Sequence, residues 1–165
     1  MVGDADFNVV WITGASTGIS RALALRLAKS GSVVFASARG ERKLATLANE
    51  VKDYPGSIIP LPLDVTDTAG VNKAYKNLVA NKGEPDLCVL NAGTYIPIDG
   101  SIFSKEVFSK QIDINWMGVI RVLDAVIPSM VDRGSGHIAV VGSVSGYRGL
   151  RTASAYGATK AALIN

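Results

Sequence analysis

Cysteine and histidine are almost absent from this chain, which has one residue of each, Cys88 and His137. A single cysteine excludes an internal disulfide, and one Cys with one His is too few for a structural zinc site, so no metal is expected. The lone histidine gives no indication of a Ser-His-Asp triad either. Cys88 lies in the apolar run Leu87-Cys88-Val89-Leu90, which favours a buried structural thiol over a nucleophile.

Clusters of charge are missing as well. The chain has 17 Lys and Arg against 14 Asp and Glu, a formal net charge of +3, but no run of five or six basic residues, so a nucleic-acid partner is not expected. The N-terminal segment carries Asp4 and Asp6 where a secretory signal peptide carries positive charge. No apolar stretch reaches the length expected of a membrane span. These absences predict a soluble, cytoplasmic protein with neither a nucleic-acid nor a membrane partner.

Aromatic residues are few, at 7% of the chain, whereas glycine is frequent, with 17 residues. Few aromatic residues together with many tight turns suit an α/β domain better than a small β-sandwich. The length predicts one domain over residues 1–165. Short apolar runs, continuous rather than alternating, predict strands that are covered on both faces. These runs are residues 9–12, 33–36, 58–63, 87–90 and 138–141.

Amphipathic helical patterns lie between these apolar runs. Apolar residues form one helical face over residues 19–27, 44–51 and 71–78. Gly31 and Gly83 stand where helices end, and Asp67 stands where one begins. A long helix is expected from about residue 104 to residue 133, with a bend at Pro128.

Strict alternation of strands and helices predicts a Rossmann-type fold. Right-handed crossovers then give a doubly wound parallel sheet with the strand order 3-2-1-4-5. The third run carries Pro60 and Pro62, and proline is tolerated at the edge of a sheet but not in its middle. The third strand is an edge in the predicted order, so the prolines support it independently.

A glycine-rich turn follows the first run and reads Thr13-Gly14-Ala15-Ser16-Thr17-Gly18-Ile19-Ser20. Glycines let a pyrophosphate approach the backbone, and the next helix offers free N–H groups and the positive end of its dipole. The spacing G-x-x-x-G departs from the commonest dinucleotide fingerprint, G-x-G-x-x-G. Taken alone, this turn fits simple turn chemistry as well as it fits a phosphate site.

The second run ends in Ala36-Ser37-Ala38-Arg39. Enzymes that use NAD usually place an acid here to hold the ribose 2′-OH, whereas an arginine suits a 2′-phosphate. No acid is present, so the location of Arg39 favours NADP(H). The alternative is an ordinary surface arginine.

The second half of the chain holds four candidate catalytic residues. Tyr156 and Lys160 share a helix face, where the ammonium would favour the phenolate and make Tyr156 a general acid or base for a carbonyl or alcohol oxygen. Ser143 follows the fifth run, at the carboxyl edge where open α/β sheets bind ligands. Asn115 lies within the long helix, where a buried amide needs partners. Taken singly, each has an ordinary alternative. Tyr156 and Lys160 fit a pair on a solvated helix face, Ser143 fits a polar residue that ends a strand, and Asn115 fits an exposed polar residue.

Together these motifs resemble the short-chain dehydrogenase/reductase family. Ser143 precedes Tyr156 by 156 − 143 = 13 residues, the usual family interval, and the resemblance extends from Asn8 to the end of the chain. It implies an oxidoreductase that transfers a hydride between NADP(H) and a carbonyl or alcohol substrate. The motifs, in family order, are Thr13-Gly14-x-x-x-Gly18-Ile19, Asp64-Val65, Asn91-Ala92-Gly93, Asn115, Ser143 and Tyr156-x-x-x-Lys160.

The resemblance also implies residue roles. Ser143 would polarise the substrate oxygen, Tyr156 would transfer its proton, Lys160 would hold the nicotinamide ribose and tune Tyr156, and Asn115 would anchor a water in a proton relay. Asp64 and Val65 would contact the adenine end. The cofactor-binding residues implied are Gly14, Ser16, Thr17, Gly18, Ile19, Arg39, Asp64, Val65, Asn91, Ala92, Gly93, Tyr156 and Lys160.

Two departures from the family pattern are visible. The third glycine of the turn is Ser20 here, which keeps its N–H, so cofactor binding is expected to survive. Family members continue through a sixth strand, a substrate-covering loop and a seventh strand, whereas this sequence stops at Asn165. We therefore expect an incomplete domain, further residues in the full protein, and an apolar edge strand at residues 137–141 that invites pairing with another chain.

Two alternatives for function remain at this stage. The chain is either part of an active reductase or a truncated, catalytically silent fold that binds a nucleotide or a partner. By resemblance, subunits would form a homodimer or homotetramer through the helix at residues 104–133 and the helix that contains Tyr156.

Overall fold

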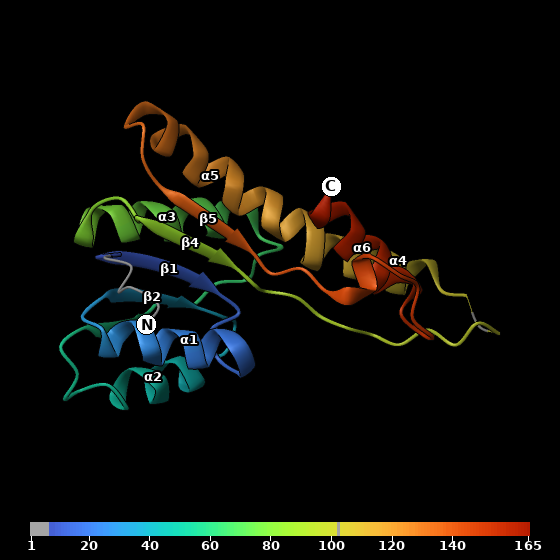
Figure 1. Cartoon of the computed structure of the whole chain (residues 1–165), viewed down its shortest axis with the longest axis horizontal. Helices are drawn as coiled ribbons and strands as arrows, with labels where there is room; N and C mark the ends of the chain where they lie inside the picture. The colour runs from blue at the N-terminus through green and yellow to red at the C-terminus, as the bar shows by residue number, and fades with distance from the viewer. Residues whose placement is uncertain (1–6, 102) are drawn as a thin grey trace.

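The computed structural model describes residues 7–101 and 103–165, and it contains one sheet of five parallel strands with helices on both faces (Figure 1). Asp4 and Asp6, which argue against a signal peptide, lie outside the described residues. The strands are β1 (Val9–Thr13), β2 (Val33–Ser37), β3 (Ser57–Pro60), β4 (Leu87–Leu90) and β5 (His137–Val140). The helices are α1 (Gly18–Lys29), α2 (Glu41–Asn49), α3 (Thr68–Lys82), α4 (Lys105–Ile112), α5 (Gly118–Asp132) and α6 (Ser154–Ile164), with a π-helical turn η1 (Asp113–Met117) and a 3-10 turn η2 (Val144–Gly146).

The strand order is β3-β2-β1-β4-β5, and every pair is parallel, which confirms the predicted topology. Strand β3 is an edge, as its prolines indicated. It ends at Pro60 and is therefore shorter than the predicted strand of residues 58–63. The chain beyond it still donates hydrogen bonds to β2 and the loop after it, from Leu61 N to Ala36 O and from Leu63 N to Ala38 O. The intervening Pro62 has no N–H to offer.

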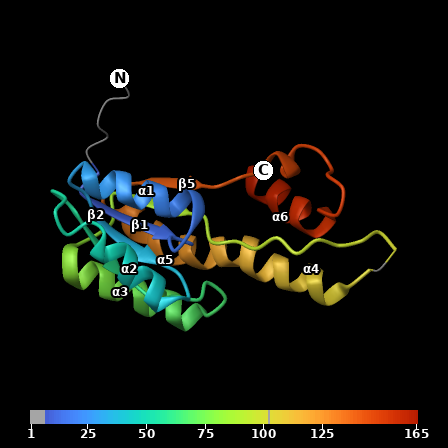
Figure 2. The ribbon, with the colours of Figure 1, turned by 90° about the horizontal axis from the view of Figure 1, so that it is seen from below.

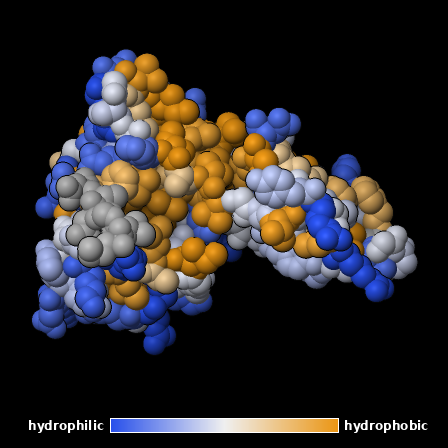
Figure 3. All heavy atoms as spheres, in the orientation of Figure 1, coloured by the Kyte–Doolittle hydropathy of each residue, from blue (hydrophilic) through white to orange (hydrophobic). Residues whose placement is uncertain are grey.

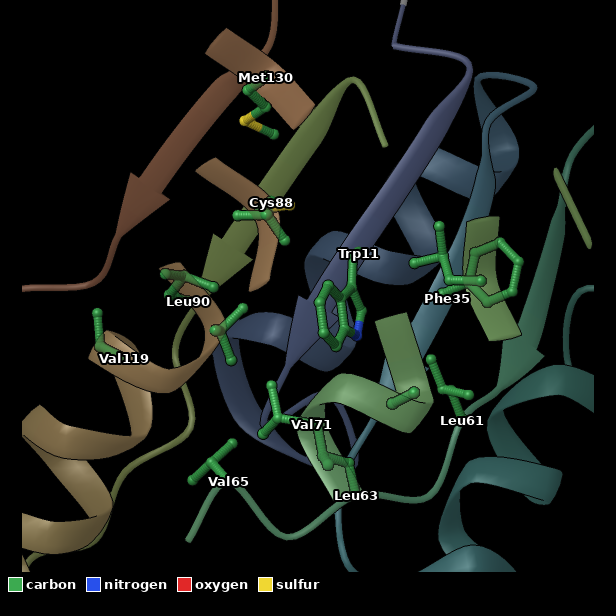
Figure 4. Packing of buried hydrophobic residues seen from close by; sticks show 14 residues of the cluster. Trp11, Phe35, Leu61, Leu63, Val65, Val71, Cys88, Leu90, Val119 and Met130 are labelled. Carbon is green, nitrogen blue, oxygen red and sulfur yellow. The ribbon is translucent and has the colours of Figure 1, made fainter. Parts of the chain in front are cut away.

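Two hydrophobic cores flank the sheet. Helices α1 and α2 cover one face, and helices α3 and α5 cover the other. Figure 4 shows the second core, in which Trp11 of β1 lies among Phe35, Val71 and Leu90. The Trp11 ring is fully buried, and its Nε1 donates to Ser37 Oγ at 2.9 Å, so burial leaves no indole N–H unpaired.

The single cysteine is part of this second core. Cys88 of β4 is fully buried, and burial raises the pKa of its thiol to about 12. A thiol of this kind stays protonated at neutral pH and is a poor nucleophile. The prediction of a structural cysteine is therefore confirmed.

The predicted long helix is present, and it contains a π-helical turn that was not expected. Helix α4 begins after Ser104, whose Oγ accepts a hydrogen bond from Val107 N at 3.3 Å. The π-helical turn η1 then separates α4 from α5, whereas Pro128 lies inside α5. The π-turn is an irregularity that the sequence did not predict, because its inserted residue changes the hydrogen-bond pattern, whereas the bend at Pro128 stays a prediction.

The helical stretch Lys105–Asp132 corrects a second expectation. It has 28 residues, and its most apolar 18-residue window has a mean hydropathy of 1.4, so by length and composition it could cross a membrane. Core helices of soluble proteins have the same properties, and here Val119, Val122 and Val126 are buried against the sheet. The absence of a membrane partner therefore stays a prediction.

Apolar side chains also reach the surface along α5 and β5, where Figure 3 shows a broad hydrophobic area. Val131 is 69% exposed, and Ile127, Ile138 and Val140 are each more than a third exposed. Among the described residues, β5 pairs with β4 alone, so its other edge carries no neighbouring strand. This is the apolar edge that the sequence predicted.

Ser20, the residue in place of the family's third glycine, is a local weakness of α1. It is fully buried, and its Oγ is the one buried side-chain polar atom without a hydrogen-bond partner in the described part of the chain. Leaving a buried hydroxyl unpaired costs about 1–3 kcal/mol. The side chain fits, but its polarity does not contribute to stability.

We predict that Ser20→Ala stabilises the protein, because it removes the unpaired hydroxyl and improves helix propensity. A gain of about 1 kcal/mol would raise Tm by roughly 2–4 °C in a domain of this size. Ser109→Ala, at an exposed helical serine, is the control for helix propensity alone. A Tm for Ser20→Ala at or below that of the unmodified protein would contradict the assignment.

Candidate active site

A cavity of about 1090 Å³ opens at the carboxyl ends of the strands. It lies between the ends of β1 and β4. The chain passes from β1 to β2 and β3 on one side of this point and adds β4 and β5 on the other, and open α/β sheets bind ligands at such a reversal of strand order. With the exception of Asn115, every catalytic and cofactor-binding residue named from the sequence lines this cavity. The fold thus brings together residues that are up to 146 positions apart, since Gly14 and Lys160 share its wall (160 − 14 = 146).

The floor of the cavity depends on close contact between the ends of β1 and β4. Thr13 Oγ1 accepts hydrogen bonds from Asn91 N at 3.1 Å and Ala92 N at 3.2 Å. Gly14 has a φ of +70°, and a Cβ atom there would lie 2.9 Å from Ala92 Cα. Only glycine combines this backbone conformation with this approach.

The first turn of α1 forms the next part of the wall. Its N-cap residue Thr17 makes no side-chain hydrogen bond to the helix, and the first turn has no acidic residue. The backbone N–H groups at this helix end therefore face the cavity without a side-chain cap, beside the lining residues Ser16, Gly18 and Ile19. Free N–H groups and the positive end of a helix dipole fit a pyrophosphate.

Basic side chains gather at the end of β2. Arg39 lines the cavity as expected, but so do Arg42 and Lys43 from the start of α2, which sequence reasoning missed. The available signal was their position in the sequence, since both follow Arg39 closely and stand in the first turn of the helix that begins at Glu41. A 2′-phosphate would meet up to three cations here.

One carboxylate shares this end of the cavity. Asp64 Oδ1 accepts hydrogen bonds from Thr66 N at 3.0 Å and Thr66 Oγ1 at 2.8 Å. The backbone N–H of Thr66 is the largest cause that lowers the pKa of Asp64, and the positive charge of Arg39 adds to it. Asp64 is therefore ionised and partly offsets the charge of Arg39.

Tyr156 and Lys160 lie one turn apart on α6 and both face the cavity. Lys160 is 5% exposed, and its Nζ donates to Val141 O at 2.6 Å and lies 5.7 Å from the centroid of the Tyr156 ring. Burial lowers the pKa of Lys160 below its usual value. The carbonyl at the end of β5 thus fixes the amine beneath the tyrosine ring.

Ser143 reaches the same cavity from the loop after β5. It is the N-cap of η2, and its Oγ accepts a hydrogen bond from Ser145 N at 3.2 Å. Two glycines let η2 pack tightly on α6: a Cβ atom at Gly146 would lie 2.9 Å from Lys160 O, and one at Gly157 would lie 2.9 Å from Ser145 O. The turn that carries Ser143 is therefore held against the helix that carries Tyr156.

Asn115 does not line the cavity but supports it from η1. Its side chain is 1% exposed and has partners at each polar atom. Oδ1 accepts from Thr94 N at 2.7 Å, and Nδ2 donates to Thr94 O at 2.9 Å and to Thr159 Oγ1 at 3.2 Å. Thr159 Oγ1 donates in turn to Tyr156 O at 2.7 Å. Asn115 thus joins the loop after β4 to the helix of Tyr156.

Comparison with known proteins gives the family of this chain. A sequence model of the short chain dehydrogenases matches residues 8–165. The chain belongs to the short-chain dehydrogenase/reductase family. It is 36% identical over 162 residues to an uncharacterized oxidoreductase of Myxococcus xanthus, a match that covers 98% of this chain and 64% of that protein.

Solved structures of the family agree in fold. An alcohol dehydrogenase from Thermococcus sibiricus, complexed with 5-hydroxy-NADP, has a TM-score of 0.87 and 31% identity over 94% of this chain and 66% of its own. A gluconate 5-dehydrogenase from Burkholderia cenocepacia, in complex with NADP and tartrate, has a TM-score of 0.87 and 32% identity over 94% and 61%. The chain spans less than two thirds of the length of these family members.

We predict that Gly14→Ala lowers the free energy of unfolding of this short-chain dehydrogenase more than Gly134→Ala does. Both positions have a positive φ, +70° and +65°, but only Gly14 has a neighbour that an added Cβ would strike. Overpacking of this kind costs about 1–3 kcal/mol, which chemical denaturation would show as the difference between the two variants. Equal losses of stability would mean that the contact between the ends of β1 and β4 is not restrictive.

Proposed function

We propose that this chain carries the cofactor-binding and catalytic part of an NADP(H)-dependent oxidoreductase that interconverts a carbonyl compound and an alcohol. The observation that carries the proposal is the single cavity lined by the uncapped start of α1, the basic residues after β2, and Ser143, Tyr156 and Lys160. A nucleotide fits the first two features and an oxygen-bearing substrate fits the third. The family membership of the chain supports the same reaction class.

The cofactor would extend across the carboxyl ends of the strands. Backbone N–H groups of α1 hold its pyrophosphate, Asp64 and Val65 lie at its adenine end, and Lys160 holds the nicotinamide ribose. When bound, the nicotinamide ring supplies or accepts the hydride. The absence of a Cβ at Gly93 lets the loop after β4 approach η1 closely beside the cavity, since a Cβ there would lie 3.3 Å from Asn115 Oδ1.

The proton of the reaction moves through Tyr156. During reduction the Tyr156 hydroxyl donates to the carbonyl oxygen, and during oxidation it accepts the proton of the alcohol. Ser143 orients and polarises the same oxygen from the opposite loop. The buried amine of Lys160, fixed by Val141 O at 2.6 Å, stabilises the negative charge that develops on the tyrosine oxygen.

A preference for NADP(H) over NAD(H) rests on the charge at the end of β2. Arg39, Arg42 and Lys43 line the cavity there, whereas Glu41, the first acid after β2, does not line it. Asp64 reduces the advantage but does not cancel three cations. The Thermococcus sibiricus and Burkholderia cenocepacia relatives, solved with 5-hydroxy-NADP and NADP, support the same preference.

Subunit association is proposed through the outer face of η1 and α5. Trp116, Ile120 and Ile127 are each about two fifths exposed and follow a helical spacing of four and seven residues. A stripe of large apolar side chains on one helix face marks an interaction surface. Pairing of two copies about a two-fold axis would cover it, because such an interface is self-complementary.

For the cofactor, we predict that NADPH binds at least tenfold more tightly than NADH. A charge-assisted contact to the 2′-phosphate is worth about 1.5–3 kcal/mol. Titration of each cofactor, followed by nicotinamide fluorescence, measures the two dissociation constants. Arg39→Asp should reverse the order, and equal affinities in the unmodified protein would reject the NADP(H) assignment.

For the chemistry, we predict that Tyr156→Phe removes nearly all turnover in the full-length protein and leaves NADPH affinity unchanged, because the ring stays and only the transferable proton is lost. Lys160→Ala should reduce both, since it has two roles. Turnover is measured as the oxidation of NADPH, followed by the absorbance of the reduced nicotinamide. A fully active Tyr156→Phe variant would overturn the mechanism, whereas cofactor binding without turnover in the unmodified protein would favour a silent nucleotide-binding fold.

A further inference from the structure

The segment that follows β4 runs in extended form beside α4 and η1 (Figure 2). Two side-chain amides hold it there. Asn115 forms paired hydrogen bonds with the backbone N–H and C=O of Thr94, at 2.7 and 2.9 Å. Gln111 does the same with Ile96, at 3.1 Å for each bond. The two amides therefore replace the neighbouring strand that an extended segment would otherwise need.

The spacing of the two amides matches the segment they hold. Residues four apart on a helix are separated by about 6 Å along its axis, and residues two apart on an extended chain by about 6.6 Å. Gln111 is fully buried, so this arrangement is part of the interior and not a surface contact. In an extended chain the backbone N–H and C=O groups of alternate residues point to the same side. Thr94 and Ile96 therefore both face the two amides, and the backbone groups of the residue between them face away from the helix.

That residue is Tyr95, and it faces the candidate active site. Its ring lies edge to face with the ring of Tyr156, with a centroid distance of 5.4 Å and an interplanar angle of 66°. Tyr95 lines the cavity and remains 49% exposed. A large aromatic surface is thus left open beside the proposed proton donor.

A strained residue fixes the position of the Tyr95 ring. Thr152 has a φ of +63°, the one positive φ at a non-glycine residue in the described chain. Its Oγ1 lies 2.6 Å from Tyr95 Oη and 2.6 Å from Arg151 O. A hydroxyl has one proton, which Thr152 donates to Arg151 O, so Tyr95 is the donor in the other bond. Thr152 O also accepts from Ile98 N at 2.9 Å.

A β-branched residue in the left-handed region persists only where its surroundings hold it. Here the surroundings are the loop after β4, through Tyr95 and Ile98. The strained residue therefore lies beside the active site, and the hydrogen bonds that hold it also join the two loops and orient Tyr95. Neither the family motifs nor the cofactor assignments account for this arrangement.

We propose that Tyr95 is a specificity-determining residue, whose ring forms one wall of the substrate subsite and receives an aromatic group attached to the substrate carbonyl. The proposal rests on the proposed function, in which the carbonyl oxygen bonds to Tyr156. A substituent on that carbonyl then lies between the oxygen and the neighbouring ring. Aromatic rings attract each other in offset or edge-to-face contact, and the exposed part of the Tyr95 ring at the cavity wall is open to such a contact.

The test compares two ketones of equal heavy-atom number, acetophenone and cyclohexyl methyl ketone. Their kcat/KM values are measured with NADPH in the full-length protein, and their dissociation constants by NMR titration of its NADP⁺ complex. We expect acetophenone to be favoured about threefold to tenfold in both measurements. Tyr95→Leu, which keeps apolar volume but removes the ring, should bring the ratio close to one. Tyr147→Leu, at a tyrosine that is 79% exposed and outside the cavity lining, should leave the ratio unchanged.

The outcomes separate this proposal from the proposed function. A ratio at or below one in the unmodified protein, or a ratio that Tyr95→Leu leaves unchanged, overturns the role of Tyr95 even if turnover is normal. Loss of turnover with an intact binding preference supports the role of Tyr95 and counts against the proposed reaction. Thermal unfolding of each variant identifies a loss of fold. If Tyr95→Leu does not fold, Tyr95→Phe, which keeps the ring, is used in its place. Tyr95→Phe should retain the preference for acetophenone, and loss of that preference would contradict a contact made by the ring.

Discussion

The contact between the ends of β1 and β4 is the constraint on which the site depends. Thr13 Oγ1 accepts hydrogen bonds from the backbone N–H groups of Asn91 and Ala92. Gly14 lies so close to Ala92 that an added Cβ atom would strike the Ala92 backbone. The strand order reverses between β1 and β4. The loops that follow these two strands therefore diverge, and the cavity opens between them. The glycine turn, the helix start that follows it and the loop after β4 are all placed by this contact.

A second set of contacts brings the chemistry to that opening. Tyr156 and Lys160 come from α6, which is attached to the sheet by the bond from Lys160 to Val141 O and to η1 through Thr159 and Asn115. Each contact satisfies a buried polar group, so removal of one partner leaves the other unpaired. Position and stability are therefore coupled here, and a change at Asn115 would act through geometry even though its side chain does not line the cavity.

The apolar surface of the chain has a different origin. The outer faces of α5 and β5 expose large side chains that the two cores do not use. The same helical stretch is apolar enough to satisfy a length-and-composition test for a membrane span, yet one side of it is buried on the sheet. This distribution of burial fits the subunit association proposed for the outer face of η1 and α5.

The sequence by itself determined the five strands, the helices between them, the strand order and the identities of most cavity residues. Apolar periodicity, the prolines of β3 and the spacing of Tyr156 and Lys160 are local patterns, so they can be read along the chain. Only the tertiary structure decided which residues complete the site. Gln111 bonds a residue 15 positions away, Asn115 reaches Thr159 across 44, and Tyr95 reaches Thr152 across 57. Such pairs leave no periodic trace, because the partners meet only after the strands and helices that separate them have packed.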